Sequence, residues 1–273
     1  MALTLMYAAS AMAQEPTPDG SPDLAERASS RFSLRGGFLF TEHRTVARVD
    51  AESGATGTTV DVERELGLDE WTRDLRLDAA LRLGRRHQIQ AGYLSLSRGG
   101  SRTLMQRIRW GEAVFEVDVD VESALAVTLI PVAYRFAIVL DERLDVGLVA
   151  GVFAVLAEAN VSAPVAGVSE RGSTEFPLPV VGIDGTVDLG RGFFLTGGAR
   201  YFALEMDGVE GTWRELRTAV EYFPLQRIGV GVGHRLIGLE ADGTEGVHTR
   251  SEGTLLFLDY EFSGPHLYLT VAF

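Results

Sequence analysis

Residues 265–273 read Pro-His-Leu-Tyr-Leu-Thr-Val-Ala-Phe, and they alternate between two kinds of side chain. One face carries Pro265, Leu267, Leu269, Val271 and Phe273, and the other carries His266, Tyr268, Thr270 and Ala272. Alternation with a period of two predicts a β-strand with one continuous apolar face. The stretch finishes on an aromatic residue in mid-pattern, which is typical of the closing strand of a lipid-facing barrel.

Length and hydropathy narrow the class of protein further. The chain has 273 residues, 46% of them hydrophobic, and these numbers fit a single large all-β domain. No run of about 18 apolar residues occurs, so the sequence excludes a transmembrane helix. A mean hydropathy of +0.09 fits a membrane β-barrel, because lipid-facing and lumen-facing residues average out along each strand. A soluble all-β protein is the alternative.

Charge and cysteine content exclude several functions. The net charge of −13 makes nucleic acid an unsuitable partner. The chain has no cysteine, which excludes a disulfide framework, a thiolate metal site and a thiol nucleophile. All 25 basic residues are arginines.

The first thirty residues differ in composition from the rest. Residues 1–13 contain a short apolar stretch that ends in Ala11-Met12-Ala13, which predicts a signal peptide with cleavage before Gln14. No basic residue precedes the apolar stretch, which fits a truncated signal peptide. Residues 14–30, rich in proline and small polar residues, predict a flexible periplasmic leader. Residues 31–273 form the expected barrel.

The number of strands depends on Ser263-Gly264-Pro265. A hairpin turn there gives eleven strands, whereas bacterial single-chain barrels have even numbers with both ends periplasmic. We therefore expect a β-bulge within one long strand and ten antiparallel strands in all, with eight or twelve as alternatives. A bulge also accounts for the shift of apolar side chains from even positions before residue 263 to odd positions after it. Loops are expected at 51–58, 160–174 and 240–252.

These features together resemble the small outer-membrane β-barrel proteins of Gram-negative bacteria, the OmpA/OmpW-like superfamily. The resemblance rests on the apolar leader, the alternating strands, tight turns such as Gly84-Arg85-Arg86, and the terminal Phe273. It implies outer-membrane lipid as surroundings and the barrel-assembly machinery as a partner. In this superfamily the terminal aromatic carries the assembly signal, which maps here onto Phe273 with Val271, Leu269 and Leu267.

Charged residues collect on the face opposite the apolar one. The inward positions predict a lumen charge network of six arginines and six carboxylates: Arg35, Arg76, Arg82, Arg200, Arg217 and Arg235 with Asp74, Asp78, Asp184, Asp188, Glu215 and Glu221. Buried charges must be paired or solvated. The network predicts either a closed structural interior or a narrow polar pore for a small solute, and neither needs a cofactor.

Two further classes of function stay open. The expected loops could bind a surface ligand, which would make the protein an adhesin-like binder. A lipid-active enzyme would need a histidine at the outer rim, where His43 and His248 are candidates, but the sequence assigns no catalytic residue. The alternating acidic residues at 116, 118, 120 and 122 could ligate calcium, although a solvated strand accounts for them better and no metal site is predicted.

Overall fold

The computed structural model of the chain describes residues 24, 30–51, 53–206, 209–243 and 256–273. The expected signal peptide, 1–13, lies outside the described residues, as do most of the leader and most of the expected 240–252 loop.

Ten long antiparallel strands close into a barrel, which confirms the predicted fold class and strand number. The strands are β1 (Phe32–Val49), β3 (Trp71–Arg82), β4 (His87–Thr103), β7 (Asp120–Leu140), β8 (Leu144–Ala163), β9 (Val168–Gly190), β10 (Phe193–Met206), β11 (Val209–Leu225), β12 (Ile228–Gly243) and β13 (Leu256–Ala272). Each strand pairs with the next one in this list, and β13 pairs with β1 to close the ring. Among the described residues, no helix is long and apolar enough to cross a membrane.

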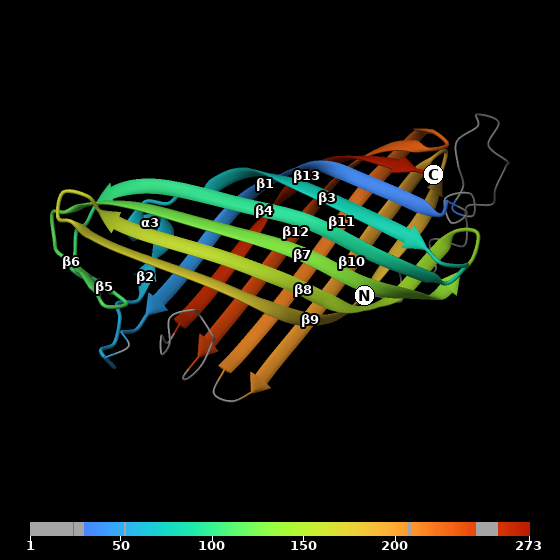
Figure 1. Ribbon diagram of the computed structural model, residues 1–273. Helices are drawn as coiled ribbons and strands as arrows, with labels where there is room; N and C mark the ends of the chain where they lie inside the picture. Colours follow the sequence, from blue (N-terminus) through green and yellow to red (C-terminus); the bar gives the residue numbers. More distant parts are fainter. Residues whose placement is uncertain (1–23, 25–29, 52, 207–208, 244–255) are drawn as a thin grey trace, which may run out of the picture.

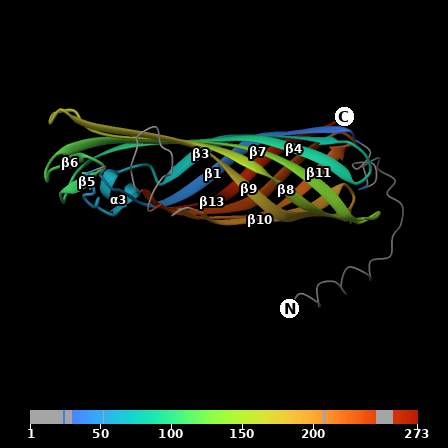
Figure 2. The same cartoon turned by 60° about the horizontal axis from the view of Figure 1, so that its bottom comes forward.

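The barrel has two distinct ends (Figures 1 and 2). At the end that we call the terminus end, tight turns join the strands, and the Arg31 amide donates to the Phe273 carbonyl at 2.9 Å. The opposite end, the loop end, carries the short elements β2 (Val60–Asp61), α3 (Val62–Leu66), β5 (Ile108–Trp110) and β6 (Ala113–Phe115). Asp61 caps the start of α3, where its carboxylate accepts from the Arg64 amide at 3.0 Å, and Gly67 caps its end with φ of 73°.

The expected β-bulge at Ser263-Gly264-Pro265 is wrong, although the single long strand is right. The partners of β13 on β1 run from Ser33–Ala272 to Val49–Leu256 in one unbroken register, and its pairing with β12 is equally continuous. Side-chain parity therefore never flips. Instead, the apolar residues change sides: Tyr260 and Phe262 point inward, whereas Leu267 and Leu269 point outward.

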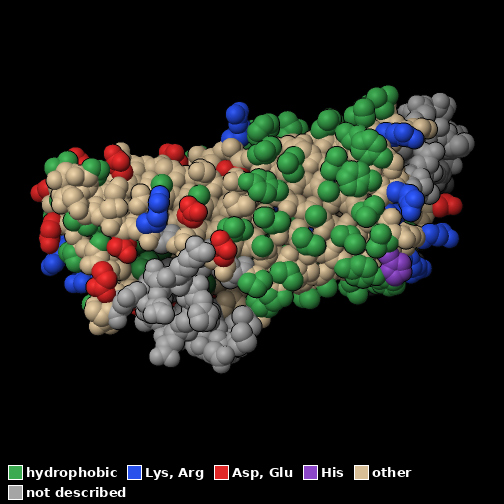
Figure 3. Space-filling view, in the orientation of Figure 1, with side chains coloured by type: hydrophobic (Ala, Val, Ile, Leu, Met, Phe, Trp, Pro, Cys, Tyr) green, Lys and Arg blue, Asp and Glu red, His purple; other side chains and the backbone are tan. Residues whose placement is uncertain are grey.

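The outward apolar residues form a belt around the terminus half of the barrel (Figure 3). On β1 the belt includes Leu34, Phe38 and Phe40, and the next outward positions are Glu42 and Arg44. Strands of about 9–11 residues suffice to cross a bilayer, whereas β7, β8 and β9 have 21, 20 and 23 residues. The loop half therefore extends well beyond the apolar belt, and on the face seen in Figure 3 charged side chains are scattered over it.

Along the barrel the character of the interior changes in the opposite direction to that of the outer face. In the terminus half many inward residues are charged or polar, and a small buried cluster of Leu24, Phe194 and Phe223 lies beside them. Further along, the inward residues form an apolar interior layer, which consists of Leu39, Leu94, Leu96, Val127, Leu129, Phe153, Val155, Leu178, Val180, Trp213, Ile237, Leu239, Tyr260 and Phe262. These residues come from eight strands, Phe202 of β10 packs against them, and none is more than 7% exposed. A second apolar cluster fills the loop end and includes residues of β2, α3, β5 and β6. The loop half thus has a core like that of a soluble protein.

The expected loop at 160–174 is mostly strand. The strands β8 and β9 pair without interruption from Leu144–Val187 to Ala163–Val168, so that only residues 164–167 connect them. Continued pairing satisfies the backbone amides and carbonyls that a long loop would leave to water. The expected 51–58 loop does lie between strands, connecting β1 to β2.

Candidate functional site

A cavity of about 200 Å³ lies inside the terminus half of the barrel. Its lining extends from Ser30, Ser33 and Ala272 at the terminus end to Arg200 and Arg235, close to the apolar interior layer. The guanidinium carbon of Arg200 lies 5.5 Å from the centre of the Phe153 ring, which belongs to that layer. The cavity is therefore polar, and the apolar interior layer bounds it on the loop side.

Arg135 of β7 binds two carboxylates of the lining. Its guanidinium binds Asp145 at 2.7 Å and also Asp184, and its side chain is only 6% exposed. Neither Arg135 nor Asp145 is in the network predicted from sequence. The signal was present, since Arg135 alternates with the outward Tyr134 and Phe136, and Asp145 with the outward Val146.

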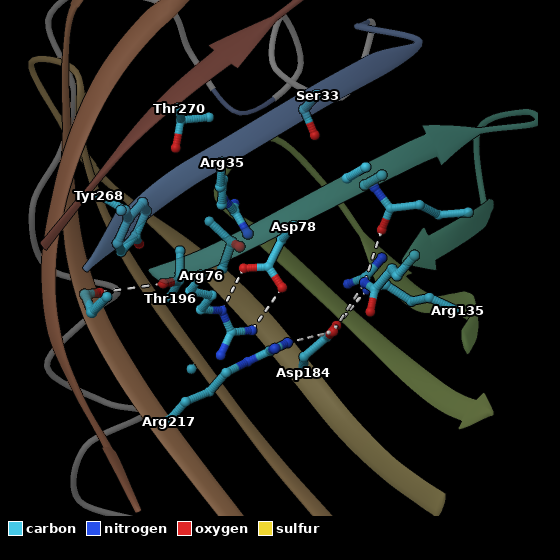
Figure 4. A pocket seen from close by; sticks show the side chains of 18 of the residues that line it. Ser33, Arg35, Arg76, Asp78, Arg135, Asp184, Thr196, Arg217, Tyr268 and Thr270 are labelled. Atoms are coloured by element: carbon cyan, nitrogen blue, oxygen red, sulfur yellow. Dashed lines mark hydrogen bonds and ion pairs between the residues drawn. The ribbon is translucent and has the colours of Figure 1, made fainter. Parts of the chain in front are cut away.

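Two further ion pairs lie beside this group, and Figure 4 shows the first of them, between Arg76 and Asp78. Arg76 binds Asp78 through two nitrogens, at 2.5 and 2.7 Å. Arg35 binds Glu221 at 3.1 Å, and the Tyr268 hydroxyl donates to the same carboxylate at 2.8 Å. Paired and hydrogen-bonded charges of this kind avoid most of the cost of burial.

The remaining arginines share their carboxylates. Arg217 lies 3.2 Å from Asp184, which Arg135 also binds. Arg200 and Arg235 both bind Glu215, at 3.6 and 2.9 Å, and Arg200 also donates to the Gln90 amide oxygen at 3.2 Å. The network thus couples residues of many strands around the lumen.

Inward glycines give these side chains their room. A Cβ at Gly231 would lie 2.3 Å from the Tyr268 ring, and one at Gly198 would lie 2.9 Å from the Nε of Arg217. A ring or guanidinium from the neighbouring strand therefore occupies the space above each glycine.

Two residues of the predicted network lie elsewhere. Asp74 accepts hydrogen bonds from the hydroxyls of Thr41 and Thr72, at 2.9 and 2.5 Å, instead of pairing with an arginine of the cavity. Asp188 lies at the terminus end, where it accepts from the amides of Leu24 and Gly190 and stabilises the turn between β9 and β10. The other ten predicted residues line the cavity or pair with residues that do.

The rim candidate His43 lies beyond the apolar belt but inside the barrel, 4% exposed. Its ring nitrogens hydrogen-bond to the Tyr260 hydroxyl at 3.0 Å and the Thr72 hydroxyl at 2.8 Å. Burial, with the positive charge of Arg98, lowers the pKa of His43 to about 3, and burial raises the pKa of Tyr260. His43 is therefore a neutral, enclosed histidine. The other candidate, His248, lies outside the described residues.

No protein-family model matches the sequence, and no curated protein matches it. Among solved structures, the outer membrane protease OmpT from Escherichia coli is similar with a TM-score of 0.59 at 13% identity, over 97% of this chain and 100% of that one. The translocator domain of the autotransporter NalP from Neisseria meningitidis gives a TM-score of 0.43 at 10% identity, over 100% of this chain and 94% of that one. The chain has the fold of the bacterial outer-membrane β-barrel proteins. At this identity the likeness to OmpT concerns the fold alone.

Proposed function

We propose that the protein is a non-enzymatic, non-conducting structural component of the bacterial outer membrane, with both termini and the cavity facing the periplasm. The observation that carries the proposal is the apolar interior layer, which spans the lumen above the charged network. Of the two functions that a charge-paired lumen allows, a structural barrel or a small pore, this layer favours the structural one.

An ion that moves through the apolar interior layer must lose its hydration. An ion that leaves the polar cavity toward the loop end meets Phe153, Trp213 and Phe262, which are at most 3% exposed. Effective desolvation of a charged group costs several kcal/mol even after the protein relaxes. The polar groups beside the layer are already hydrogen-bonded, Asp74 to Thr41 and Thr72, and Tyr260 to His43. They therefore offset little of this cost.

Conductance in planar bilayers tests the proposal. We expect no single-channel steps from the native barrel. A double substitution, Phe153→Ala with Trp213→Ala, should introduce measurable conductance steps if the layer is the barrier. It removes two neighbouring rings of the layer, whose centres lie 5.3 Å apart. Stable steps from the native protein that change with Arg76→Gln or Arg217→Gln would instead show that it is a pore.

The second candidate function is surface binding at the loop end, and the length of the strands favours it. A barrel that only spans the membrane does not need strands of about 20 residues or a second apolar core. Shortening the loop 164–167 or replacing residues 51–58 should leave the barrel folded and abolish binding of whole cells to a host or matrix surface. Unchanged binding in both variants would remove this candidate.

The non-enzymatic part of the proposal rests on the enclosure of His43. Incubation of the folded barrel with peptide and phospholipid substrates should give no turnover. Turnover that disappears in His43→Ala or His248→Ala would contradict it.

A further inference from the structure

The cavity lining holds more positive than negative charge. Its cations are Arg35, Arg76, Arg82, Arg135, Arg200, Arg217 and Arg235, and the carboxylates beside them are Asp78, Asp145, Asp184, Glu215 and Glu221. This makes seven against five among the described residues, and arginines still outnumber carboxylates when Arg82 is left out. The excess stands out because the chain as a whole has a net charge of −13.

The excess charge lies where arginines approach one another. Arg217 shares its partner Asp184 with Arg135, and the positive charges of Arg200 and Arg76 also act on its guanidinium. The positive charge of Arg35 likewise acts on the guanidinium of Arg76. Figure 4 shows Arg35, Arg76 and Arg217 directed toward the same part of the cavity. Like charges at such range repel unless an anion lies between them.

Unused hydrogen-bond donors are found in the same lining. The Nε atoms of Arg200 and Arg35 and the hydroxyl of Thr270 are buried without a hydrogen-bond partner among the described residues. The side chain of Arg200 is only 7% exposed, so bulk water does not solvate it freely. Buried donors are almost always satisfied, by protein groups or by bound molecules.

The size and the donor type restrict the ligand. A volume of about 200 Å³ has room for several waters or for one small hydrated ion. Planar guanidinium groups match the paired oxygens of phosphates and carboxylates, and arginine is the residue most often used to bind them. A bound oxyanion would offset the excess of arginines over carboxylates.

From the charge excess, the converging arginines and the unused donors, we propose that the cavity at the terminus end binds a small oxyanion of the phosphate class. The bound anion would link strands β1, β3 and β11 through Arg35, Arg76 and Arg217. The proposal is independent of the surface-binding function, and it needs only that the cavity can be reached from the terminus end.

Calorimetric titration of the folded barrel in detergent tests the proposal, with inorganic phosphate as the probe and chloride at equal ionic strength as the reference. We expect saturable binding of one phosphate per barrel. Arg217→Gln should weaken it by about tenfold or more, because one charge-assisted contact is lost. Arg214→Gln is the matched control, since Arg214 is on the same strand but is half-exposed on the outer face of the loop half. It should bind as the native protein does.

Further arms separate the competing explanations. Sulfate, a dianion at any working pH, should bind equally at pH 6 and pH 8, whereas phosphate should bind better at pH 8. Glycerol phosphate should compete with phosphate if the natural source is a lipid headgroup, and it should fail to compete if the site accepts only the free ion. Phosphate binding no tighter than chloride binding, or equal weakening by Arg217→Gln and Arg214→Gln, would overturn the proposal.

Discussion

Arg135 illustrates how single residues hold this barrel together. Its guanidinium binds both Asp145 and Asp184, and all three side chains are nearly buried. Removing one member of a buried ion pair leaves an uncompensated charge, which costs about 3–5 kcal/mol. The residue therefore matters for the stability of the barrel wall.

Arg135→Met should lower the free energy of unfolding by about 3–5 kcal/mol. The measurement is denaturant unfolding in lipid vesicles, followed by tryptophan fluorescence. Arg214→Met is the control, because its side chain is 52% exposed and its ion pairs with Glu240 and Glu261 are at the surface. Such pairs contribute about 0–1 kcal/mol. Equal effects of the two variants would show that the interior network is not a source of stability.

Sequence alone identifies the inward face at this scale but not the partners on it. Alternation placed Arg76, Asp78 and Arg217 in the lumen. It could not show that Arg217 pairs with Asp184 from a strand two positions away around the ring, because that depends on the stagger of the strands. The unused donor of Arg200 is likewise visible only in three dimensions.

The strand β13 shows at the level of one element how the protein divides between lipid and water. Its outward residues are apolar from Pro265 to Phe273, whereas Asp259, Glu261 and Ser263 precede them on the same face. The side that carries the apolar residues changes near residue 263, where the strand leaves the belt. One continuous strand thus serves two environments.

Leu269→Arg should destabilise the barrel by about 2–4 kcal/mol, the cost of an arginine on the lipid face near the middle of the bilayer. Glu261→Arg introduces the same side chain on the same face and strand but beyond the belt, so it should change stability little. Unfolding of both variants in vesicles makes the comparison. A large loss from Glu261→Arg would mean that the belt extends further toward the loop end than the outward residues indicate.

The end of β13 should also matter for assembly. Phe273→Ala keeps the backbone contacts with Arg31 and Phe32 but removes the ring that lies 6.0 Å from the Phe32 ring. We expect less inserted barrel in cells, measured by heat-modifiable gel migration of membrane fractions, and normal refolding of the purified chain in detergent. Normal insertion in cells would show that Phe273 carries no assembly signal.

The expected bulge failed at this scale for a physical reason. Two different arrangements move the apolar residues from even to odd positions: a bulge, or a change of the apolar face from the inside of the barrel to the outside. The pattern within one strand cannot distinguish them. Only the partners on β1 and β12 do so, and pairing between distant strands is not written in any local stretch of sequence. The predicted number of strands is right because it rested on the even strand number of bacterial single-chain barrels, which excludes a hairpin turn at residues 263–265.

The two ends of the barrel differ, and this difference predicts which end faces the cell surface. Short turns gather at the terminus end, and β2, α3, β5 and β6 gather at the loop end. In outer-membrane barrels the short turns are periplasmic and the longer loops face outward. The loop end should therefore be exposed on the cell surface.

Cysteine labelling can test this direction, because the chain has no cysteine of its own. Val165→Cys lies in the loop 164–167, where Val165 is 93% exposed, and Glu142→Cys lies in an exposed turn at the terminus end. A membrane-impermeant maleimide applied to intact cells should label Val165→Cys and not Glu142→Cys. After the cells are lysed, it should label both variants. The reverse pattern would invert the proposed orientation, including the compartment that the cavity faces.

The apolar interior layer gives the two halves of the barrel different responses to temperature. Lipid surrounds the terminus half, whereas the loop half keeps its apolar side chains away from water by folding around them. Exposure of apolar surface to water raises the heat capacity, so most of the heat-capacity change on unfolding should come from the loop half. Hydrophobic stabilisation weakens on cooling. The part that projects from the membrane should therefore be the part that loosens first in the cold.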